Sequence, residues 1–380
     1  MKRKTVRILL LIVLAVTSLS FLFESHILPG LTAQKSVKGV LWFIQETIRI
    51  IKDDYIEQAN PSQTMNGAYR GLVGSLDEFS SYLSPEMVSK YKQSRKSAPF
   101  GVGLVLYKKF RTFPVVIGVF DNSPAAQKGI RIGDTISSLD GQSTLLMSMV
   151  EANLLLRDND GSPLKLKLLR ASTNKEVTIE RTKIYDSPFI YTEIPETSGL
   201  LTIHSLSPPC VEEIAASILP RVKAKNLPLI LDLRNCHDGD YEEMQRFTNL
   251  FLRASNIGFL ESRTGKKEIL SCPDSPKLAN IPLFIWTNQA TMGPAEAAAA
   301  VLKEQSRATI IGFRTSGLTA QQKFIRLEDG SGILLTAAVF NLGAKKKIWG
   351  EGLEPDVKIE GMDQSQNTYL QKTQGLLVHN

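Results

Sequence analysis

The run PLILDLRNCHDGD, residues 228–240, indicates the fold class of this chain. Its first half is short and almost continuously apolar, which is typical of a strand buried on both faces of a parallel sheet. A polar turn follows, and then YEEMQRFTNLFLR at 241–253 repeats its apolar residues at helical spacing. A buried strand, a turn and an amphipathic helix in this order predict one unit of an α/β layer.

The same alternation continues on both sides of this run. Further strands and helices are predicted, in chain order, at 200–206, 211–222, 281–288, 294–305, 308–312 and 332–340. Together they predict an α/β core domain over residues 185–360. The last residues, 361–380, are polar and are expected to form a loosely ordered tail.

The pattern is different between residues 97 and 184. FGVGLVL (100–106) and PVVIGVF (114–120) are short apolar strands, and LKLKLLR (164–170) alternates apolar and polar residues as a strand does. SPAAQKG (123–129) begins with a helix-capping serine and ends at glycine, and SMVEANLLL (148–156) is a second helix. This segment predicts a small α+β domain.

A helical region is predicted over 36–96, because apolar residues recur there at helical spacing. Before it, four basic residues precede the uncharged run ILLLIVLAVTSLSFLF, residues 8–23. A basic flank and an apolar run are typical of an export signal, and the flank favours a cytoplasmic N-terminus. We expect residues 1–30 to form a single, uncleaved anchor in the cytoplasmic membrane, with the bulk of the chain on the periplasmic or cell-surface side.

Composition argues against several kinds of function. The formal charge is +7 over 380 residues, but Lys and Arg are scattered and form no basic stripe with interleaved aromatic residues, so a nucleic-acid partner is not expected. The three cysteines and four histidines show no metal-ligand spacing. We therefore expect neither a metal nor another cofactor.

Short stretches along the chain carry a family pattern: GAYRGLVGSLDEFSSYLSP (67–85), FGVGL (100–104), SPAAQKGIRIGDTISSLDGQS (123–143), LILDLRN (229–235), RATIIG (307–312), LEDGSGILLT (327–336) and GEGLEPDV (350–357). In this order they resemble the carboxyl-terminal processing proteases, a family of Ser–Lys peptidases with a PDZ domain. The resemblance implies a multidomain α/β and α+β fold. Its parts are a helical N-terminal region, a PDZ-like domain at 97–184 and an α/β protease core at 185–360.

In that family a Ser hydroxyl attacks the peptide carbonyl, a neutral Lys is the general base, a Gln orients the Lys, and backbone N–H groups stabilise the oxyanion. On this pattern the nucleophile position is Gly293 and the general-base position is Leu318, 25 residues later as in the family. Gln322 falls at the orienting position. The oxyanion loop has Asp238 and Gly239 where the family has two glycines, which is expected to put a negative charge where the oxyanion must develop. The resemblance thus implies a serine-type peptidase fold without the family's nucleophile or base.

Another residue could take the role of the nucleophile. Thr291 lies two residues before the vacant position, Ser316 lies on the loop that would carry the lysine, and Cys236 stands beside His237. Adjacent residues at a strand end usually point to opposite sides, which disfavours a direct Cys–His pair, whereas His204 on a neighbouring strand could reach Cys236. Packing as a small apolar side chain is the other explanation for this cysteine. An active endopeptidase with a re-sited nucleophile therefore stays open.

The PDZ-like segment keeps a peptide-binding pattern. PDZ domains bind C-terminal residues by strand addition and hold the carboxylate with backbone N–H groups of a glycine-bearing loop. Phe100, Gly101, Val102, Gly103 and Leu104 fit this loop, with glycines that permit close approach and apolar side chains that line a pocket.

The leading hypothesis is a pseudoprotease that binds C-terminal or unfolded polypeptide segments without cleaving them. An active family protease and a second copy of this chain are further candidate partners. The amphipathic helices expected at 36–96 are the surface through which such association is predicted.

Overall fold

The structure is a computed structural model and describes residues 37–94, 100–158, 161–171, 173–343, 346–361 and 363–377. The expected membrane anchor, 1–30, lies outside these residues. Among the described helices, none combines the length and the hydropathy needed to cross a bilayer. The chain divides into two compact units, Met1–Met65 and Asn66–Asn380.

The described part of the first unit contains helix α2 (Val37–Asp54). Its apolar residues Leu41, Ile44 and Ile48 recur at intervals of three and four residues, and each is at least 43% exposed. Arg49 forms ion pairs with two acidic residues of the same helix. The predicted amphipathic helix is present, and its large apolar side chains are largely exposed.

The second unit contains a six-stranded sheet in the order β11-β12-β14-β18-β19-β23. The edge strand β11 (Phe189–Ile194) is antiparallel to its neighbour, and the other strands are parallel. Those strands are β12 (Ser198–Ile203), β14 (Leu229–Asp232), β18 (Leu283–Thr287), β19 (Thr309–Gly312) and β23 (Val357–Lys358). The strand predicted within 228–240 is therefore β14, in the interior of this sheet.

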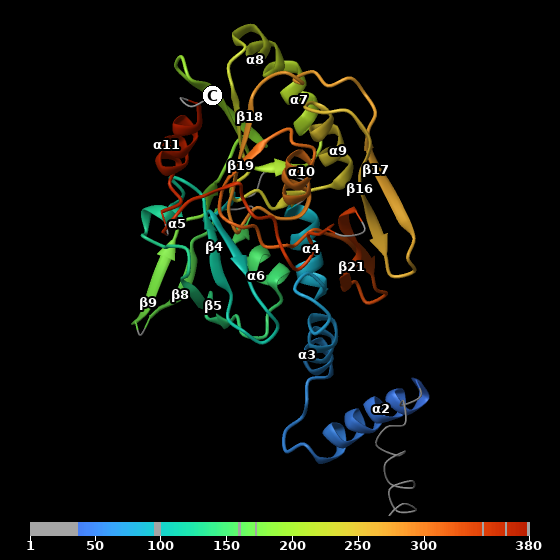
Figure 1. Ribbon diagram of the computed structural model, residues 1–380. Helices are drawn as coiled ribbons and strands as arrows, with labels where there is room; N and C mark the ends of the chain where they lie inside the picture. Colours follow the sequence, from blue (N-terminus) through green and yellow to red (C-terminus); the bar gives the residue numbers. More distant parts are fainter. Residues whose placement is uncertain are drawn as a thin grey trace, which may run out of the picture. The chain divides into compact units, whose positions relative to one another are not determined.

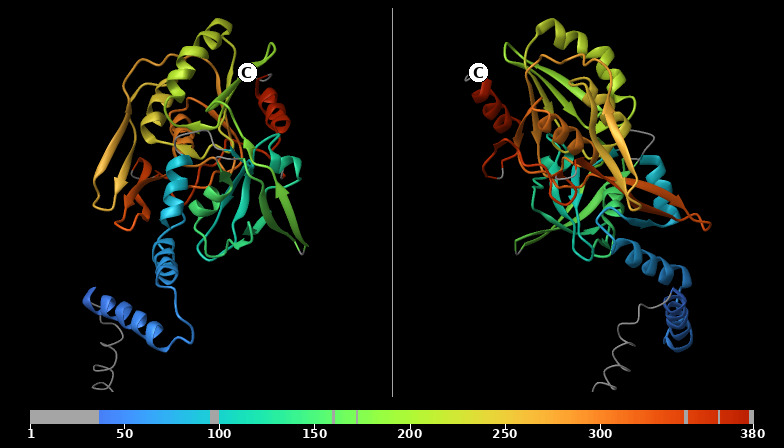
Figure 2. Two further views of the ribbon diagram at one scale, coloured as in Figure 1. Left: turned by 180° about the vertical axis from the view of Figure 1, so that it is seen from behind. Right: turned by 45° about the vertical axis from the view of Figure 1, so that its right-hand side comes forward.

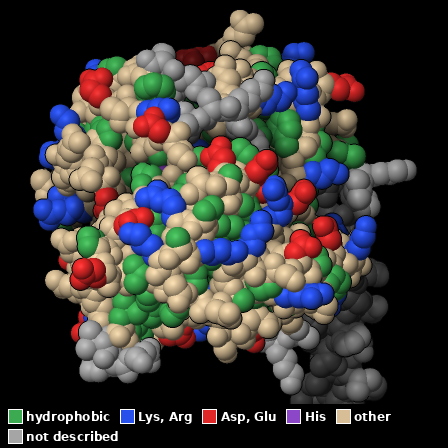
Figure 3. Space-filling view, turned by 90° about the horizontal axis from the view of Figure 1, so that it is seen from above, with side chains coloured by type: hydrophobic (Ala, Val, Ile, Leu, Met, Phe, Trp, Pro, Cys, Tyr) green, Lys and Arg blue, Asp and Glu red, His purple; other side chains and the backbone are tan. Residues whose placement is uncertain are grey.

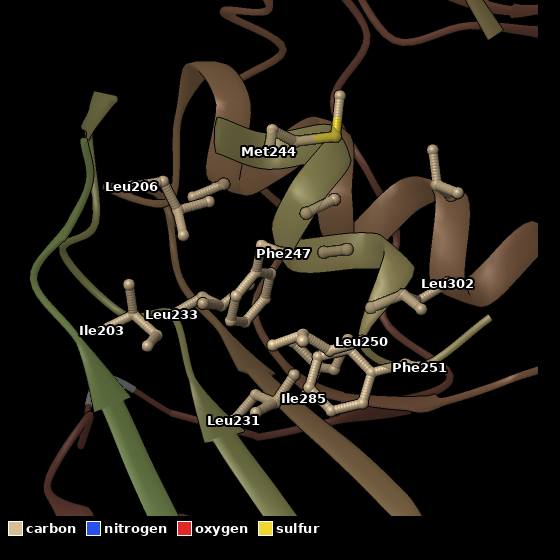
Figure 4. Close-up of a cluster of buried hydrophobic side chains, with 14 of the residues drawn as sticks. Ile203, Leu206, Leu231, Leu233, Met244, Phe247, Leu250, Phe251, Ile285 and Leu302 are labelled. Atoms are coloured by element: carbon tan, nitrogen blue, oxygen red, sulfur yellow. The ribbon is translucent and has the colours of Figure 1, made fainter. Parts of the chain in front are cut away.

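Helices cover both faces of the sheet (Figures 1 and 2). One face packs against α7 (Cys210–Ser217), α8 (Leu219–Lys225), α9 (Tyr241–Asn249) and α10 (Gly293–Glu304). Figure 4 shows Phe247 and Phe251 pointing from the α9 segment toward Leu231 and Ile285 of the sheet. Burial of these large apolar side chains fixes the helices on the sheet, since each stabilises the fold by about 2 kcal/mol or more.

The opposite face packs against α11 (Gln366–Leu377). Tyr369 is fully buried, and its hydroxyl donates a 2.8 Å hydrogen bond to the Thr287 carbonyl. The Trp286 indole donates to the Thr373 hydroxyl at 2.9 Å. The prediction of a loosely ordered tail is therefore wrong for this part of the chain. Two residues one helical turn apart dock on the sheet, although their neighbours in the sequence are mostly polar.

The α+β domain predicted at 97–184 contains a sheet in the order β3-β4-β5-β8-β9, with β6 (Gln142–Ser143) beside β5. Its strands are β3 (Leu104–Tyr107), β4 (Val115–Val119), β5 (Thr135–Leu139), β8 (Leu164–Arg170) and β9 (Thr173–Ile179). The helices are α5 (Pro124–Gln127), capped by Ser123 as predicted, and α6 (Met149–Leu155). A second, small sheet has the order β10 (Thr182–Lys183), β2 (Phe100–Gly101), β7 (Arg157–Asp158).

A third sheet joins distant parts of the chain. Its strands are β1 (Ser81–Leu83), β16 (Ala254–Ser262), β17 (Lys267–Cys272), β20 (Ala320–Arg326), β21 (Gly332–Gly343) and β22 (Lys346–Lys347). The region 36–96 is thus not entirely helical, because β1 lies between α3 (Pro61–Gly74) and α4 (Pro85–Ser94). β1 pairs with β21, so its partner comes from a part of the chain that no local pattern can report.

The PDZ-like domain lies against the ends of the core strands. At Gly118 of β4, an added Cβ would lie 2.3 Å from Oδ1 of Asn235 and 2.7 Å from the Cβ of Ala290. Nδ2 of Asn235 donates to the Val119 carbonyl at 3.1 Å. The close approach of the Asn235 and Ala290 side chains to the β4 backbone therefore favours glycine at position 118.

Charged side chains on the second unit are often paired with the opposite sign. Lys303 lies 2.8 Å from Asp356, and Lys225 lies 2.6 Å from Glu193. On the face drawn in Figure 3, basic and acidic side chains are interspersed. Mixed signs of this kind are ordinary for a solvated surface.

Candidate active site

The structure brings the three predicted parts of the site together at the amino end of α10. Gly293, at the nucleophile position, is the first residue of that helix. Its N–H donates a 3.0 Å hydrogen bond to the carbonyl of Leu318, at the base position. The N–H of Met292 donates at 3.0 Å to the carbonyl of Cys236, in the oxyanion loop. Two backbone hydrogen bonds thus join the neighbourhood of the nucleophile position to the other two parts.

The nucleophile position has space but no side chain. Gly293 has a φ of +60°, in the left-handed region that favours glycine. A Cβ built there would meet the His237 carbonyl oxygen at 4.0 Å, which is an ordinary contact. With neither a hydroxyl nor a thiol, Gly293 cannot form an acyl-enzyme.

The base position lies in an apolar environment. Leu318 is 4% exposed and packs with Val105, Ala290 and Met292. Five partly buried residues surround these four, and all nine are called the Leu318 cluster below: the others are Phe79, Tyr107, Ile117, Phe120 and Trp349. The PDZ-like domain and the core both contribute to the cluster. An amine at position 318 would be desolvated, which is the condition that lowers a lysine pKa.

A buried carboxylate positions the loop that carries Leu318. Glu296, in the first turn of α10, is fully buried and accepts hydrogen bonds from the N–H groups of Gly317 and Leu318, at 2.7 and 2.9 Å. The Thr315 hydroxyl also donates to it. Burial raises the pKa of Glu296 to about 7, against the opposite effect of these three hydrogen bonds. The sequence pattern does not reveal this role, because acidic residues are common in the first turn of any helix.

Asp238 of the oxyanion loop is paired with a charge from the PDZ-like domain. Asp238–Gly239 form β15, which pairs with β13 (Ser205–Leu206). The Arg157 guanidinium, on β7, lies 2.9 Å from the Asp238 carboxylate. The predicted negative charge of Asp238 is thus present at the loop and is paired with Arg157. Arg157 could not be identified from the sequence, since 81 residues separate it from its partner.

His237 is held as a neutral ring. Arg157 donates to Nε2 of His237 at 2.8 Å, and Nδ1 donates to the Asn235 carbonyl at 2.8 Å. Because arginine has no acceptor, Nε2 must accept, and the proton therefore lies on Nδ1. Desolvation lowers the pKa of His237, the Asp238 carboxylate acts in the opposite direction, and Arg157 adds to the lowering. The ring supports the oxyanion loop in its uncharged form.

The two candidate hydroxyl nucleophiles have other partners. Thr291 is fully buried, and its hydroxyl donates to the Leu233 carbonyl at 2.8 Å and accepts from the Asn288 N–H at 3.1 Å. The Ser316 hydroxyl donates to the Gln289 carbonyl. Both hydroxyl groups therefore contribute to the turns around the site.

The candidate thiol nucleophile is buried. Cys236 is fully buried, and desolvation raises its pKa well above that of an ordinary thiol. A reactive cysteine needs a lowered pKa and access to solvent. The His204 ring stacks on Tyr185, with ring centroids 4.8 Å apart, and His237 is engaged by Arg157. The environment of Cys236 is that of an inert, packed side chain.

Gln322, at the orienting position, lies on β20. Its Nε2 donates to the Phe79 carbonyl at 2.8 Å. Phe79 belongs to the Leu318 cluster, so Gln322 borders the cluster through this residue. Within the described ranges, no group of three or more His, Cys, Asp or Glu side chains is arranged to hold a metal ion.

The predicted peptide-binding loop joins β2 to β3. Phe100 and Gly101 form β2, and Leu104 begins β3. Val102 and Leu104 are buried in the domain, whereas Phe100 is 37% exposed. The apolar side chains of the loop therefore belong mainly to the domain's own core.

Gly103 and the loop carbonyls are closely fitted to the domain. Gly103 has a φ of +79°, and an added Cβ would lie 2.2 Å from the Cβ of Ser123, so only glycine fits. The Val102 carbonyl accepts from the Ala125 N–H at 2.9 Å, and the Gly103 carbonyl accepts from the Phe120 N–H at 3.0 Å. These carbonyl groups are thus satisfied within the domain itself.

The chain has a PDZ-like domain packed on an α/β core and a candidate site at the amino end of α10. These features are those of serine-type peptidase folds that carry a PDZ domain. The sequence profile of peptidase family S41 matches residues 198–359, and that of the PDZ domain matches residues 98–180. The fold is similar to that of the photosystem II D1 C-terminal processing protease, with a TM-score of 0.68 and 22% identity. This likeness covers 83% of the present chain and 86% of that chain.

Curated relatives extend the match over most of the chain. The carboxy-terminal processing protease CtpA of Bacillus subtilis is 30% identical over 324 residues, which are 84% of this chain and 69% of that protein. A probable CtpA-like serine protease of Staphylococcus haemolyticus is 25% identical over 338 residues, 88% of this chain and 67% of that protein. The chain belongs to peptidase family S41, the carboxyl-terminal processing proteases.

Proposed function

We propose that this chain is a pseudoprotease of its family, which binds C-terminal or unfolded polypeptide segments through its PDZ domain without cleaving them. The observation that carries the proposal is the pair Gly293 and Leu318. A backbone hydrogen bond joins the two positions at the amino end of α10. Neither residue has a side-chain group that can attack a peptide carbonyl or abstract a proton. Proteolysis by the family's chemistry requires both.

The alternative is a working endopeptidase with a re-sited nucleophile at Thr291, Cys236 or Ser316. The surroundings of these residues do not favour it. The two hydroxyl groups donate to backbone carbonyls, and the thiol is buried with a raised pKa. The pseudoprotease is therefore the proposal that we put forward.

We further propose a setting and partners for this activity. Residues 1–30 anchor the chain in the cytoplasmic membrane, with the remainder on the outer side. The exposed apolar residues of α2 support association with an active family protease or with a second copy of this chain. Such an assembly presents bound segments to the active partner or regulates it.

The test is proteolysis of β-casein by the purified full chain, compared with the double variant Gly293→Ser, Leu318→Lys. We expect no cleavage by the natural sequence and measurable cleavage by the double variant, because a Cβ at position 293 would lie an ordinary 4.0 Å from the His237 carbonyl oxygen and burial favours a neutral lysine. The φ of +60° strains a serine there by about 1–2 kcal/mol, which lowers the stability of the double variant without removing its hydroxyl from the site. Single variants Thr291→Ala, Cys236→Ala and Ser316→Ala are the controls. Turnover by the natural chain that one of these abolishes would establish the alternative.

A further inference from the structure

β3 is the edge strand of the PDZ-like sheet, since it ends the strand order β3-β4-β5-β8-β9. In strand addition a peptide pairs with the N–H and C=O groups that an edge strand directs outward. Opposite Leu106 of β3 stands Val116 of β4. The Val116 N–H donates to the Asp134 carbonyl, and its carbonyl accepts from the Gly133 N–H, both at 2.8 Å. The N–H and C=O groups of Val116 thus point away from β3, so Leu106 and Val116 form a pair without hydrogen bonds between them. The N–H and C=O groups of Leu106 therefore point away from β4, toward the open edge of the sheet.

A side chain of the same domain already occupies this edge. Oδ1 of Asn153, on α6, accepts from the Leu106 N–H at 3.2 Å, and Nδ2 of Asn153 donates to the Leu106 carbonyl at 3.3 Å. A carboxamide offers the same donor and acceptor as a peptide group. Asn153 therefore pairs with Leu106 as a residue of an added strand would.

We propose that Asn153 closes the peptide groove, and that a C-terminal peptide adds to β3 only after displacing this side chain from Leu106. The inference rests on the proposed function, because it concerns the regulation of the same peptide site. The peptide replaces two hydrogen bonds that already exist, so the exchange at Leu106 adds little to binding. The observed affinity is lowered by the fraction of molecules in which the groove is open.

The contacts around Asn153 suit a closure that a ligand can open. The two hydrogen bonds to Leu106 are long for N–H···O bonds, which are usually near 3.0 Å. Nδ2 has a second acceptor in the Met149 carbonyl, at 3.0 Å, which it can keep after leaving Leu106. Asn153 is only partly buried, so its freed carboxamide oxygen can be hydrated. α6 itself stays anchored by Ala152, which is fully buried in the domain core.

The experiment measures peptide affinity of the full chain by fluorescence anisotropy. The probe is a pool of fluorescein-labelled decapeptides with apolar residues at the last three positions and a free carboxylate, and the same pool with a C-terminal amide is the ligand control. Asn153→Ala is expected to bind the acid pool about tenfold more tightly than the natural chain, which corresponds to about 1.4 kcal/mol. Asn153→Asp, which cannot donate to the Leu106 carbonyl, is expected to give a smaller gain.

Asn153→Gln is the matched control. Glutamine keeps the carboxamide and, like alanine, is a better helix former than asparagine. We expect the peptide affinity of Asn153→Gln to stay within about threefold of that of the natural chain. This change is smaller than the tenfold gain expected when Asn153→Ala removes the carboxamide that competes with the peptide. A gain as large as that of Asn153→Ala would assign the effect to helix propensity and overturn the closure.

The remaining outcomes separate this inference from the proposed function. Equal binding by the natural chain and Asn153→Ala overturns the closure and leaves the peptide function standing. Binding by Asn153→Ala alone supports both. Absence of binding by the natural chain and every variant overturns the proposed function and the closure with it. Hydrogen exchange at Leu106 without peptide is a second readout: it should be faster in Asn153→Ala, and unchanged exchange would also overturn the closure.

Discussion

Glu296 is a single carboxyl group on which the position of the Leu318 loop depends. Burial raises its pKa to about 7, so the folded chain keeps a proton on it between about pH 4.5 and pH 7, whereas the unfolded chain has lost that proton. The free energy of unfolding should therefore fall by about 3 kcal/mol as the pH rises through this window, and Glu296 adds no further change above it. In Glu296→Gln this contribution should vanish, as measured by urea denaturation of the full chain at successive pH values.

The control is Glu212→Gln, which changes an exposed carboxylate in the first turn of α7. Its pH profile should follow that of the natural chain, since this change leaves Glu296 and its hydrogen bonds to the Leu318 loop in place. At pH above 7, the free energy of unfolding of Glu296→Gln should also be lower than that of the natural chain by about 1–3 kcal/mol. The reason is that the amide nitrogen of the glutamine would face one of the N–H groups of Gly317 and Leu318, and two donors cannot bond to each other. A Glu296→Gln profile parallel to the natural one would show that this carboxyl group is not the source of the dependence.

Individual site residues differ in how far the sequence could indicate them. The spacing between two positions points to Gly293 and Leu318, because each lies at a fixed distance from a recognisable strand end. The contacts that position these residues are not local. Arg157 reaches the oxyanion loop from another domain, and Glu296 is distinguished from ordinary first-turn acids only by its burial.

Strand β4 approaches the core so closely that Gly118 has no room for a methyl group. In Gly118→Ala the new Cβ would meet Asn235 and Ala290, so β4 must move away and the Asn235–Val119 hydrogen bond must lengthen. We expect the free energy of unfolding to fall by about 1–3 kcal/mol, as for overpacking elsewhere. Hydrogen exchange in β4 should become faster, which mass spectrometry of the full chain can measure.

Gly343→Ala is the matched control for this change. Gly343 is likewise a strand residue, the last of β21, and an added Cβ there meets no atom within 4 Å. Its effect should stay within about 0.5 kcal/mol, as for most surface substitutions. Equal effects of the two alanine variants would contradict the close packing of β4 on the core.

Secondary-structure elements were predictable where their own residues carry the pattern. The continuous apolar run of β14 and the alternation of β8 are local signals, and both strands are present. β1 is three residues long and becomes a strand only because β21 lies beside it. α11 has few apolar residues, and its burial depends on Trp286 of a distant strand. Tertiary contacts therefore decided the elements that the local sequence did not.

The Leu318 cluster joins the PDZ-like domain to the core within the second unit, because residues of both pack in it. Leu318→Lys would bury an amine among apolar side chains, which should lower the free energy of unfolding at pH 7 by about 3–5 kcal/mol. Burial lowers the pKa of this lysine below that of the unfolded chain, so the loss should shrink as the pH rises toward 10. Urea denaturation of the full chain at pH 7 and pH 9.5 measures both effects.

Leu318→Met serves as the control for shape without charge. Methionine has a similar volume and should cost less than about 1.5 kcal/mol, with no dependence on pH over this range. If lysine were tolerated as well as methionine at pH 7, the cluster would have to admit water or an opposite charge to position 318.

The Leu318 cluster also bears on which evolutionary changes remain open to this lineage. A serine acquired first at position 293 would find no base to activate it, and a lysine acquired first at position 318 would weaken the fold while serving no nucleophile. Neither single substitution is rewarded, and both are penalised, because a serine at position 293 would have to adopt a left-handed backbone conformation that favours glycine. Because Leu318 packs between two domains, a chain that is the pseudoprotease proposed above would regain peptidase activity only through two changes together, and its loss of activity would behave as a one-way step.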